Sequence, residues 1–433
     1  MIESLEYYLR RMNSLTNWEE RPRGGMEVAL EPIRDLVEQM AVPIQGLHFV
    51  HVTGTKGKGS VGSLIERAMG VAGYRTGRYS SPHVQSINER ITIDGEAVSD
   101  ECLRDALAFV FRTYDEAAQQ NSAGAKATWF DVFTAAALFI FAKSDLEWVV
   151  MEVGLGGRLD STNIISADVS VLTNVELEHT EILGDTRAKI AAEKLGILKN
   201  GGFLVTGIDT ADEIARIVKL ACDDKCCDVA FVPVNDTFSF SERNRRLAAR
   251  VLNVIGAQGW RIFGQNLPVS ESILTSDVIR QAQLPGRREL FDVPVGDKTV
   301  VIVLDAGHVA ESARLLSLEI KRMRILSDTC IAVFAIRPDK DAAAIAAVLG
   351  DICHTVVCTE LAGKRGSVEA AVLASLVTKE GCLAVIQDQP TTALEIALNT
   401  AQAVNGWVLV IGSFDLVSTL RPAVTSVGKT VEC

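Results

Sequence analysis

The chain has 433 residues, of which 48% are hydrophobic and 23% charged, and this balance excludes a disordered chain and favours two folded domains. Its formal net charge of −12 at pH 7 argues against nucleic acid or an anionic membrane surface as a partner, although local Lys and Arg residues can still bind an anionic substrate. The nine cysteines lack the paired spacing of a zinc site and fit reduced thiols, and the most apolar run, 132–142, is too short to span a bilayer, so we expect a cytoplasmic protein.

In chain order, the first predicted elements are a strand at 47–52, a glycine-rich loop at 54–60 and a helix directly after it. Further apolar runs predict a helix at 132–144, strands at 146–154 and 168–175, a helix at 186–199 and a strand at 202–207. Strands that alternate with helices indicate a doubly wound, mostly parallel α/β sheet.

The pattern changes towards the C-terminal part of the chain. A helix with a serine cap is predicted at 241–259, and the Pro-Gly pair within 281–289 suits a hinge or linker. Beyond it, a second series of alternating apolar runs predicts a smaller α/β domain. We therefore divide the chain into domains 1–285 and 286–433.

The loop GTKGKGS has the composition of a phosphate-binding turn. Gly54, Gly57 and Gly59 lack Cβ atoms, so backbone N–H groups can approach phosphate oxygens closely. Lys58 supplies a positive charge for the terminal phosphates, and Ser60 supplies a hydroxyl at the helix N-terminus for Mg²⁺. The spacing departs from the common phosphate-loop consensus, because a glycine separates the lysine from the serine. A purely structural turn is the alternative, and the preceding strand and following helix weigh against it.

Several strings in one order make the chain similar to a known family. The loop, including Thr55, resembles the ATP loop of the Mur ligase superfamily and, within it, of the folylpolyglutamate synthase/dihydrofolate synthase family. The resemblance continues through YSSPH at 79–83, NERITIDG at 88–95, TWFDVFTAAAL at 128–138, MEVGLGGRLDSTN at 151–163, VELEHTEILGDT at 175–186, AAEKLGILK at 191–199, LPGRRE at 284–289, LDAGH at 304–308, PDKD at 338–341 and IGSFDLV at 411–417. It implies an ATP-binding Mur-ligase domain at 1–285 and a Rossmann-like glutamate-ligase domain at 286–433.

The resemblance also implies a reaction. In the family, the γ-phosphate of ATP activates the carboxylate of a folate or of dihydropteroate, and the amine of L-glutamate then displaces phosphate to form an amide. ATP and Mg²⁺ are implied, with K⁺ as a further cation, and the implied Mg²⁺ ligands are Ser60, Ser81, Glu152 and His179. Catalytic roles are implied for Lys58, Lys194, His179 and His308. Lys194 matches a lysine that is carbamylated by CO₂ in the family, although Leu195 replaces the usual alanine here.

Contacts to the nucleotide and to the acid are implied in the same way. Asn244, Arg287 and Asp305 match positions that contact ATP, and the second domain would close over the nucleotide so that His308 faces the phosphates. The implied substrate residues are Arg90, Thr128, Phe130, Asp131, Leu159, Asp160 and Ser161. Trp129 and Phe130 could stack on a pterin ring or equally belong to the core. The string DAGHV at 305–309 replaces the usual Asp-Gly-Ala-His followed by Asn or Thr, so the turn there is expected to differ.

Each of these residues, taken alone, also has a structural interpretation as a strand-end cap, a surface lysine or a core aromatic. Two other functions stay open, a different amide ligase on the Mur scaffold and a nucleotide-binding protein without catalysis. A cell-wall ligase is disfavoured, because the roughly fifty residues before the loop are too few for a further domain. The expected partners are small-molecule substrates, with no nucleic acid and no membrane, and the expected state is a monomer.

Overall fold

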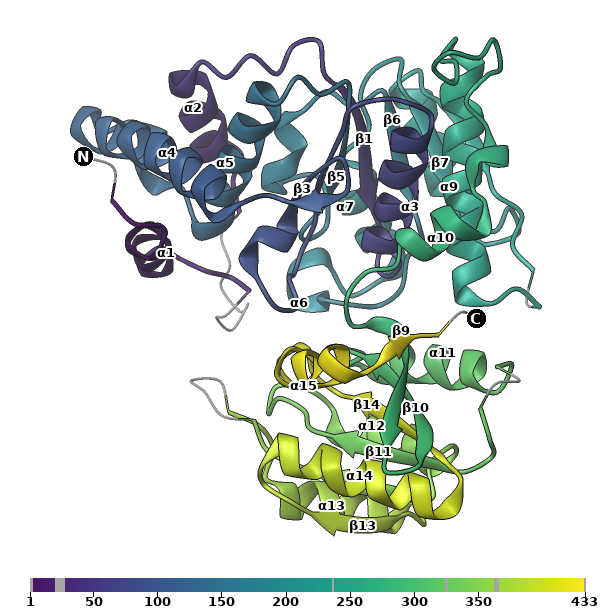
Figure 1. Cartoon of the computed structure of the whole chain (residues 1–433). Coiled ribbons are helices and arrows are strands. Elements are labelled where there is room, and N and C mark those ends of the chain that lie inside the picture. Colours follow the sequence, from purple (N-terminus) through teal and green to yellow (C-terminus); the bar gives the residue numbers. More distant parts are fainter. Residues whose placement is uncertain (1–2, 20–27, 236, 324–325, 362–365, 432–433) are drawn as a thin grey trace. The chain divides into compact units, whose positions relative to one another are not determined.

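The structure is a computed structural model that describes residues 3–19, 28–235, 237–323, 326–361 and 366–431. The chain divides into two compact units, Met1–Ala282 and Gln283–Cys433, and each contains its own sheet (Figure 1). None of the described helices has the length and the apolar character that crossing a membrane requires. The eight described cysteines are free thiols.

In the described part of the first unit, eight strands form one sheet in the order β4-β3-β2-β5-β1-β6-β7-β8. The strands are β1 (His48–Thr53), β2 (Thr76–Tyr79), β3 (Ile91–Ile93), β4 (Glu96–Ala97), β5 (Trp148–Glu152), β6 (Val169–Leu172), β7 (Phe203–Thr206) and β8 (Asp228–Phe231). β3 and β4 are antiparallel to their neighbours and the other pairings are parallel. The predicted doubly wound, mostly parallel sheet is confirmed.

Strand β1 occupies the switch point of this sheet. Val52 pairs with Glu152 of β5 on one side and with Val171 of β6 on the other. The chain continues from β1 to β2 on the β5 side, and later crosses from β5 to β6. Open α/β sheets bind ligands at the carboxyl ends of the strands at such a point, and the glycine loop follows β1 there.

Helices cover both faces of the sheet, as Figure 1 shows. They are α1 (Leu5–Ser14), α2 (Glu31–Met40), α3 (Lys58–Val71), α4 (Asp100–Gln120), α5 (Trp129–Lys143), α6 (Thr180–Leu183), α7 (Arg187–Leu195), α8 (Glu213–Asp224), α9 (Phe240–Ala257) and α10 (Ser276–Gln281), with 3₁₀ turns η1 (Ile87–Arg90), η2 (Ala123–Lys126), η3 (Ser161–Ile164) and η4 (Glu271–Ile273). Because successive strand residues face opposite sides, Phe49 joins the core beneath α4 and α5, whereas Val50 and Val52 join the core beneath α3 and α9.

Two local predictions differ from the structure. The cap of α9 is Ser239, whose side chain accepts the N–H of Glu242, and Ser241 lies inside the first turn. Between the predicted strand at 202–207 and this helix, the structure adds α8 and β8, whose short apolar runs were not assigned to any element. β8 has four residues, and its parallel pairing with β7 supplies what the local sequence does not.

In the second unit, the described strands form a seven-stranded sheet in the order β13-β12-β11-β14-β10-β9-β15. Its elements are β9 (Arg287–Val295), β10 (Lys298–Asp305), α11 (Ala310–Ile320), β11 (Cys330–Phe334), α12 (Ala342–Gly350), β12 (Thr355–Cys358), α13 (Ala370–Lys379), β13 (Leu383–Ile386), α14 (Pro390–Val404), β14 (Trp407–Ile411), α15 (Phe414–Val427) and β15 (Lys429–Thr430). β9 pairs antiparallel with β10 and β15, and the other pairings are parallel. The smaller α/β domain is confirmed.

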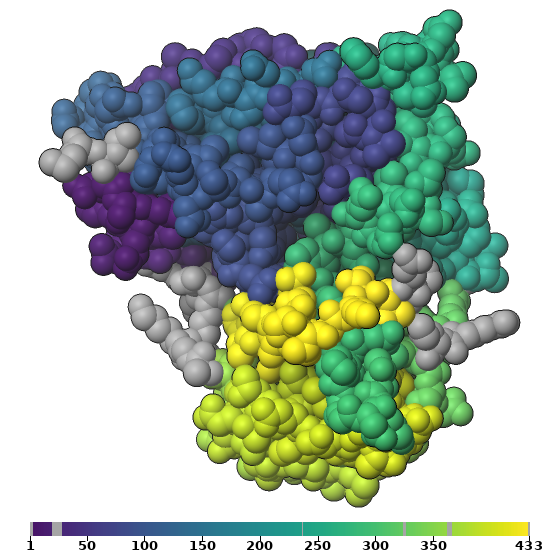
Figure 2. Space-filling model, viewed as in Figure 1, coloured from purple at the N-terminus to yellow at the C-terminus, as the bar shows by residue number. Residues whose placement is uncertain are grey.

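The segment between the units is shorter than the predicted linker at 281–289. α10 ends at Gln281 and β9 begins at Arg287, because Arg287 already pairs with Asp305 of β10. At the C-terminal end of the chain, helix α15 and the exposed strand β15 lie on the surface of this unit, in yellow in Figure 2.

Candidate active site

The glycine loop is fixed by residues that follow β6. The N–H of Thr55 donates to the carbonyl of Asn174 at 3.1 Å, and the N–H of Lys56 donates to Oδ1 of Asn174 at 3.0 Å. The hydroxyl of Thr173 donates to the carbonyl of Lys56 at 2.6 Å. These hydrogen bonds fix the backbone of the loop, and helix α3 begins immediately after it at Lys58.

Two of the loop glycines are required by their surroundings. Gly54 has φ +145°, and a Cβ there would lie 1.8 Å from Oγ1 of Thr173. Gly57 has φ +84°, and a Cβ there would lie 2.4 Å from Oδ1 of Asn244 on α9. The second contact brings Asn244, a predicted nucleotide residue, against the loop. Gly59 and Ser60 lie in the first turn of α3, whose N-terminal N–H groups favour an anion.

We expect Gly54→Ala to weaken ATP binding at least about tenfold, because the added methyl group must displace Thr173 from the loop. Gly259→Ala is the matched control, since Gly259 also has a positive φ, of +108°, but nothing lies within 4 Å of its Cβ position. Calorimetric titration with ATP measures the difference. Equal ATP affinity in the two variants would show that this loop does not carry the nucleotide.

Two lysines converge on one carbonyl oxygen of the loop. Nζ of Lys58 lies 3.2 Å from the carbonyl oxygen of Gly54, and Nζ of Lys194 on α7 lies 2.9 Å from the same atom. Lys194 is only 4% exposed. Burial, reinforced by the charge of Lys58, lowers the pKa of Lys194 to about 7. A substantial neutral fraction of this amine is therefore present near neutral pH.

The predicted metal ligands follow four neighbouring strands, β2, β5, β1 and β6. Glu152 ends β5, is 6% exposed, and its Oε2 accepts the N–H of Ser81, which follows β2, at 3.3 Å. His179 follows β6 with φ +53°, and its Nε2 lies 3.8 Å from Oε1 of Glu178. The structure thus brings Glu152 and Ser81 together and places His179 beside Glu178.

The donor chemistry fits a hard divalent cation. Glu152 offers a carboxylate, Ser60 and Ser81 offer hydroxyls, and Mg²⁺ is commonly held through one or two carboxylates together with substrate phosphates. Across the described residues, no group of three or more His, Cys, Asp and Glu side chains is arranged to hold a metal by itself. The predicted set contains just two such side chains, so it would depend on nucleotide oxygens for the remaining ligands.

Sequence analysis missed two charged residues of this site. Nζ of Lys56 lies 3.8 Å from Oε1 of Glu178, and the side chains are 17% and 29% exposed. Burial opposes ionisation of Glu178, but the charges of Lys56, His179, Lys58 and Lys194 together hold its pKa below the ordinary value. Lys56 and Glu178 are sequence neighbours of predicted site residues in GTKGKGS and VELEHTEILGDT. Their position in these strings was therefore the sequence feature that could have identified them.

Residues of the predicted acid pocket form a connected polar group. Thr128 caps α5 in a reciprocal capping box with Asp131, and Oγ of Ser161 donates to Oδ1 of Asp131 at 2.6 Å. Oδ2 of Asp160 accepts the N–H of Leu155 at 2.9 Å. Burial raises the pKa values of Asp131 and Asp160, against the opposing effect of their hydrogen bonds.

The aromatic residues of this region differ in burial. Trp129 is 4% exposed and stacks on Phe133 with ring centroids 5.3 Å apart, so it belongs to the core. Phe130 is partly buried, and its ring limits the space at Gly154, where a Cβ would lie 2.6 Å from Phe130 Cζ and 3.2 Å from Asp160 Oδ2. Leu159 packs as a partly buried residue against the same core.

Arg90 has a structural role that the sequence analysis did not anticipate. It is 2% exposed, and its Nη atoms donate to the two carboxylate oxygens of Glu19 at 2.9 and 2.7 Å. Its Nε donates to Nδ1 of His83 at 2.8 Å, and its guanidinium lies 4.9 Å from the ring centroid of Trp129. These contacts tie the segment before α2 to η1, and substrate contact by Arg90 stays a prediction.

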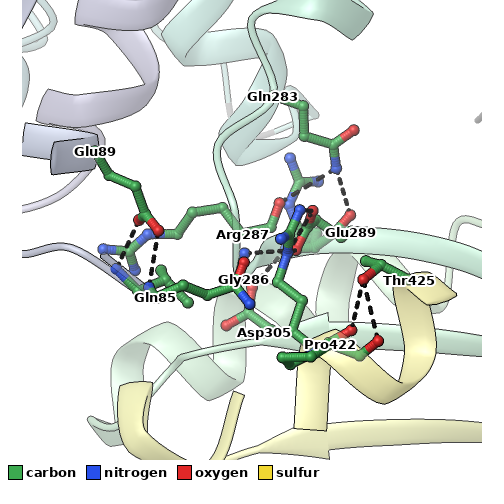
Figure 3. Close-up of polar contacts among 12 residues, drawn as sticks. Gln85, Glu89, Gln283, Gly286, Arg287, Glu289, Asp305, Pro422 and Thr425 are labelled. Atoms are coloured by element: carbon green, nitrogen blue, oxygen red, sulfur yellow. Dashed lines mark hydrogen bonds and ion pairs between the residues drawn. The ribbon is translucent and has the colours of Figure 1, made fainter. Parts of the chain in front are cut away.

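In the second unit, Asp305 shapes the turn that contains the DAGHV string. Its Oδ1 accepts the N–H of Gly307 at 2.7 Å, and its Oδ2 accepts the N–H of Arg288 at 3.1 Å. A Cβ at Gly307 would lie 2.8 Å from Oδ1 of Asp305, which explains why the glycine occupies this place in the turn. Figure 3 shows Asp305 beside Gly286, whose N–H donates to Glu289 at 2.7 Å.

The other predicted nucleotide residues of this unit gather around Phe414. The guanidinium of Arg287 lies 4.8 Å from the ring centroid of Phe414, and the ring of His308 lies 5.5 Å from it. His308 Nδ1 donates to the carbonyl of Ala306 at 3.0 Å. These side chains share the carboxyl ends of β10 and β14.

Comparison with known proteins agrees with this arrangement. Residues 52–253 match the Mur ligase middle domain. The folylpolyglutamate synthase of Lacticaseibacillus casei is 32% identical over 412 residues, which cover 90% of this chain and 92% of that protein. Among solved structures, the folylpolyglutamate synthase of Thermotoga maritima superimposes with a TM-score of 0.80 at 23% identity, covering 98% of this chain and 97% of that one. The bifunctional folylpolyglutamate synthase/dihydrofolate synthase of Yersinia pestis, complexed with AMPPNP and a Mn ion, gives 0.73 at 25% identity and 98% coverage of both chains. This chain therefore belongs to the folylpolyglutamate synthase/dihydrofolate synthase family of Mur ligases.

Proposed function

We propose that this protein is an ATP-dependent ligase that joins L-glutamate to a folate, to dihydropteroate, or to both. The observation that carries the proposal is the convergence of Lys58 and Lys194 on the carbonyl of Gly54, at the switch point of the sheet. A glycine loop at a helix N-terminus binds phosphate. The identity of the acid and the amine is proposed from the related folylpolyglutamate synthases.

The reaction proceeds in two displacements. The carboxylate of the acid attacks the γ-phosphorus of ATP, ADP leaves, and an acyl phosphate forms. The amine of L-glutamate then attacks the acyl carbon, the amide bond forms, and phosphate leaves with the electron pair of the broken carbon–oxygen bond. Lys58 and the N–H groups at the start of α3 stabilise the charge on the phosphoryl oxygens, and the loop fixes their position.

We place Mg²⁺ among Ser60, Ser81, Glu152 and His179, where it would neutralise phosphate charge when bound. The Mn ion with AMPPNP in the Yersinia pestis relative supports a divalent cation. K⁺ is proposed on the resemblance alone. Residues 1–285 are assigned ATP binding and residues 286–433 glutamate ligation, with Asn244, Arg287, Asp305 and His308 at the nucleotide. The cytoplasmic location and the monomeric state stay predictions.

Lys194 is proposed to carry a carbamate. The ammonium form first loses a proton to solvent. The neutral amine then attacks CO₂, the new nitrogen–carbon bond forms, and a second proton is released, so the side chain changes from cation to anion. The low pKa of Lys194, about 7, makes the required neutral amine available. Its place beside Lys58 and the loop would allow the resulting anion to support the metal site.

Release of ADP by the purified protein tests the proposed function. We expect ADP to form with ATP, Mg²⁺, L-glutamate and either dihydropteroate or tetrahydrofolate, and to fall to background when the acid or glutamate is omitted. Chelation of Mg²⁺ with EDTA should stop ADP release, and added Mg²⁺ should restore it. Background ADP release with both acids would reject the proposal and leave a different amide ligase or a non-catalytic nucleotide-binding protein.

A further inference from the structure

A buried histidine, His51, lies on β1, the strand that leads into the glycine loop. It is 0% exposed, and its Nε2 lies 2.8 Å from Oγ1 of Thr162 in η3, 111 residues away in the chain. Thr162 is also 0% exposed. The contact therefore joins the strand that carries the phosphate loop to the turn that carries Asp160.

The direction of the hydrogen bonds follows from the single proton of the threonine hydroxyl. Oγ1 of Thr162 lies 2.5 Å from Oδ1 of Asp160 and donates to this carboxylate oxygen. Its hydroxyl proton is thereby used, so the contact with His51 must be a donation from Nε2–H of the imidazole. Burial lowers the pKa of His51 to about 3, which agrees with a neutral ring protonated at Nε2.

With Nε2 as the donor, the other imidazole nitrogen, Nδ1, is an unprotonated hydrogen-bond acceptor. Nδ1 of His51 is buried and has no hydrogen-bond partner among the described residues. A buried polar atom without a partner destabilises a fold, and the neighbours of His51 on this strand, Val50 and Val52, are apolar. An apolar side chain at position 51 would avoid this cost, so the histidine is explained by the hydrogen bond that it donates.

Asp160 is the group that this hydrogen bond fixes. Its Oδ1 accepts the hydroxyl and the N–H of Thr162, and its Oδ2 accepts the N–H of Leu155 at 2.9 Å. A Cβ at Gly154 would lie 3.2 Å from Oδ2 of Asp160 and 2.6 Å from Cζ of Phe130, so the carboxylate and this ring border the same glycine. Rotation of Asp160 would therefore break the turn at 154–156 and change the shape of the surface beside Phe130.

We propose that His51 is a positioning residue for the acid substrate, which it controls by holding Thr162 and thereby the orientation of Asp160. The inference rests on the proposed function and on Asp160 contacting the acid. His51 itself is 0% exposed, so we expect it to contact neither the acid nor ATP. Its removal should therefore weaken recognition of the acid and leave recognition of ATP unchanged.

The test compares steady-state constants of the full-length protein and its variants, with dihydropteroate and tetrahydrofolate as acids. His51→Leu removes the donor, and we expect KM for the acid to rise about tenfold while KM for ATP changes less than about twofold. His51→Gln keeps an N–H donor near the place of Nε2 and should restore most of the acid affinity. Calorimetric titration with the same acids checks that KM reports binding.

Thr162→Val removes the same hydrogen bond from its acceptor side. It removes the hydroxyl that His51 holds and with it the hydrogen bond to Asp160, and we expect at least the same rise in KM for the acid. The double variant His51→Leu/Thr162→Val should raise KM for the acid no more than Thr162→Val alone, because His51 acts through the hydroxyl that this change removes. Thr113→Val is the matched control, since its buried hydroxyl donates to the carbonyl of Phe109 within α4.

Two failures are distinguishable. An inactive wild-type protein that binds neither acid rejects the proposed function, whereas an active wild type with unchanged acid KM in Thr162→Val overturns the role of His51. The role of His51 would also be overturned if KM for the acid, KM for ATP and kcat all changed by similar factors in proportion to the loss of thermal stability. If His51→Leu does not fold, His51→Gln and Thr162→Val decide the question in the same way.

Discussion

Lys58→Met is expected to reduce ADP release at least about a thousandfold while the fold is retained, because a preorganised charge on the transferring phosphoryl group is lost. Nζ of Lys58 is held 3.2 Å from the carbonyl of Gly54, so the ammonium group already stands at the loop before nucleotide binds. Methionine keeps the length and helix propensity of the side chain at the first position of α3. ADP release and thermal denaturation are measured on the same samples.

The control for Lys58 is Lys219→Met, which removes an exposed lysine of α8 that lies far from the loop in sequence. We expect wild-type turnover from this control. Retention of activity in Lys58→Met, or loss of cooperative unfolding, would mean that Lys58 supports the turn and not phosphoryl transfer.

Lys194→Met is expected to abolish turnover and yet to stabilise the protein at pH 7. The pKa of Lys194 is about 7 in the folded chain, against 10.5 for an ordinary lysine side chain. Between these pH values the unfolded chain binds a proton that the folded chain does not, so the free energy of unfolding rises with pH across this window. Removing the lysine therefore adds stability on the order of 4 kcal/mol at pH 7, and the gain shrinks to nothing as the pH approaches about 10.5.

Chemical denaturation in CO₂-depleted buffer measures this gain without interference from carbamylation. Lys189→Met is the control from the same helix, because Lys189 is exposed and pairs with Asp185 at 2.9 Å on the surface. It should change stability little and leave turnover intact. Active Lys194→Met protein would remove the carbamate role, and a destabilised variant would show that the amine contributes to folding.

Elements with strong local signals were predictable from the sequence. The strand at 47–52, the glycine loop and the helix after it follow from an apolar β-branched run, three glycines and helical spacing. Glu152 could be placed at a strand end for the same reason, since its strand is apolar and bounded by glycines.

Contacts between distant segments were not predictable, because they depend on tertiary packing. His51 and Thr162 are 111 residues apart, and the ion pair of Arg90 with Glu19 spans 71 residues. The cap of α9 was placed two residues late, since Ser239 and Ser241 have the same local chemistry and just one adopts the extended backbone of a cap. The turn at Gly307 likewise depends on the nearby carboxylate of Asp305.

In the first unit, the predicted phosphate and metal residues come from other elements than two of the predicted acid residues. The phosphate loop, Glu152 and His179 follow three adjacent strands, β1, β5 and β6, whereas β3, β4, α4 and α5 are inserted along the chain between β2 and β5. This insertion carries Thr128 and Asp131, two of the predicted acid residues, and its helices α4 and α5 share a core with Phe49 of β1. An exchange of this segment that aims at a different acceptor acid therefore has to keep the residues that pack on β1.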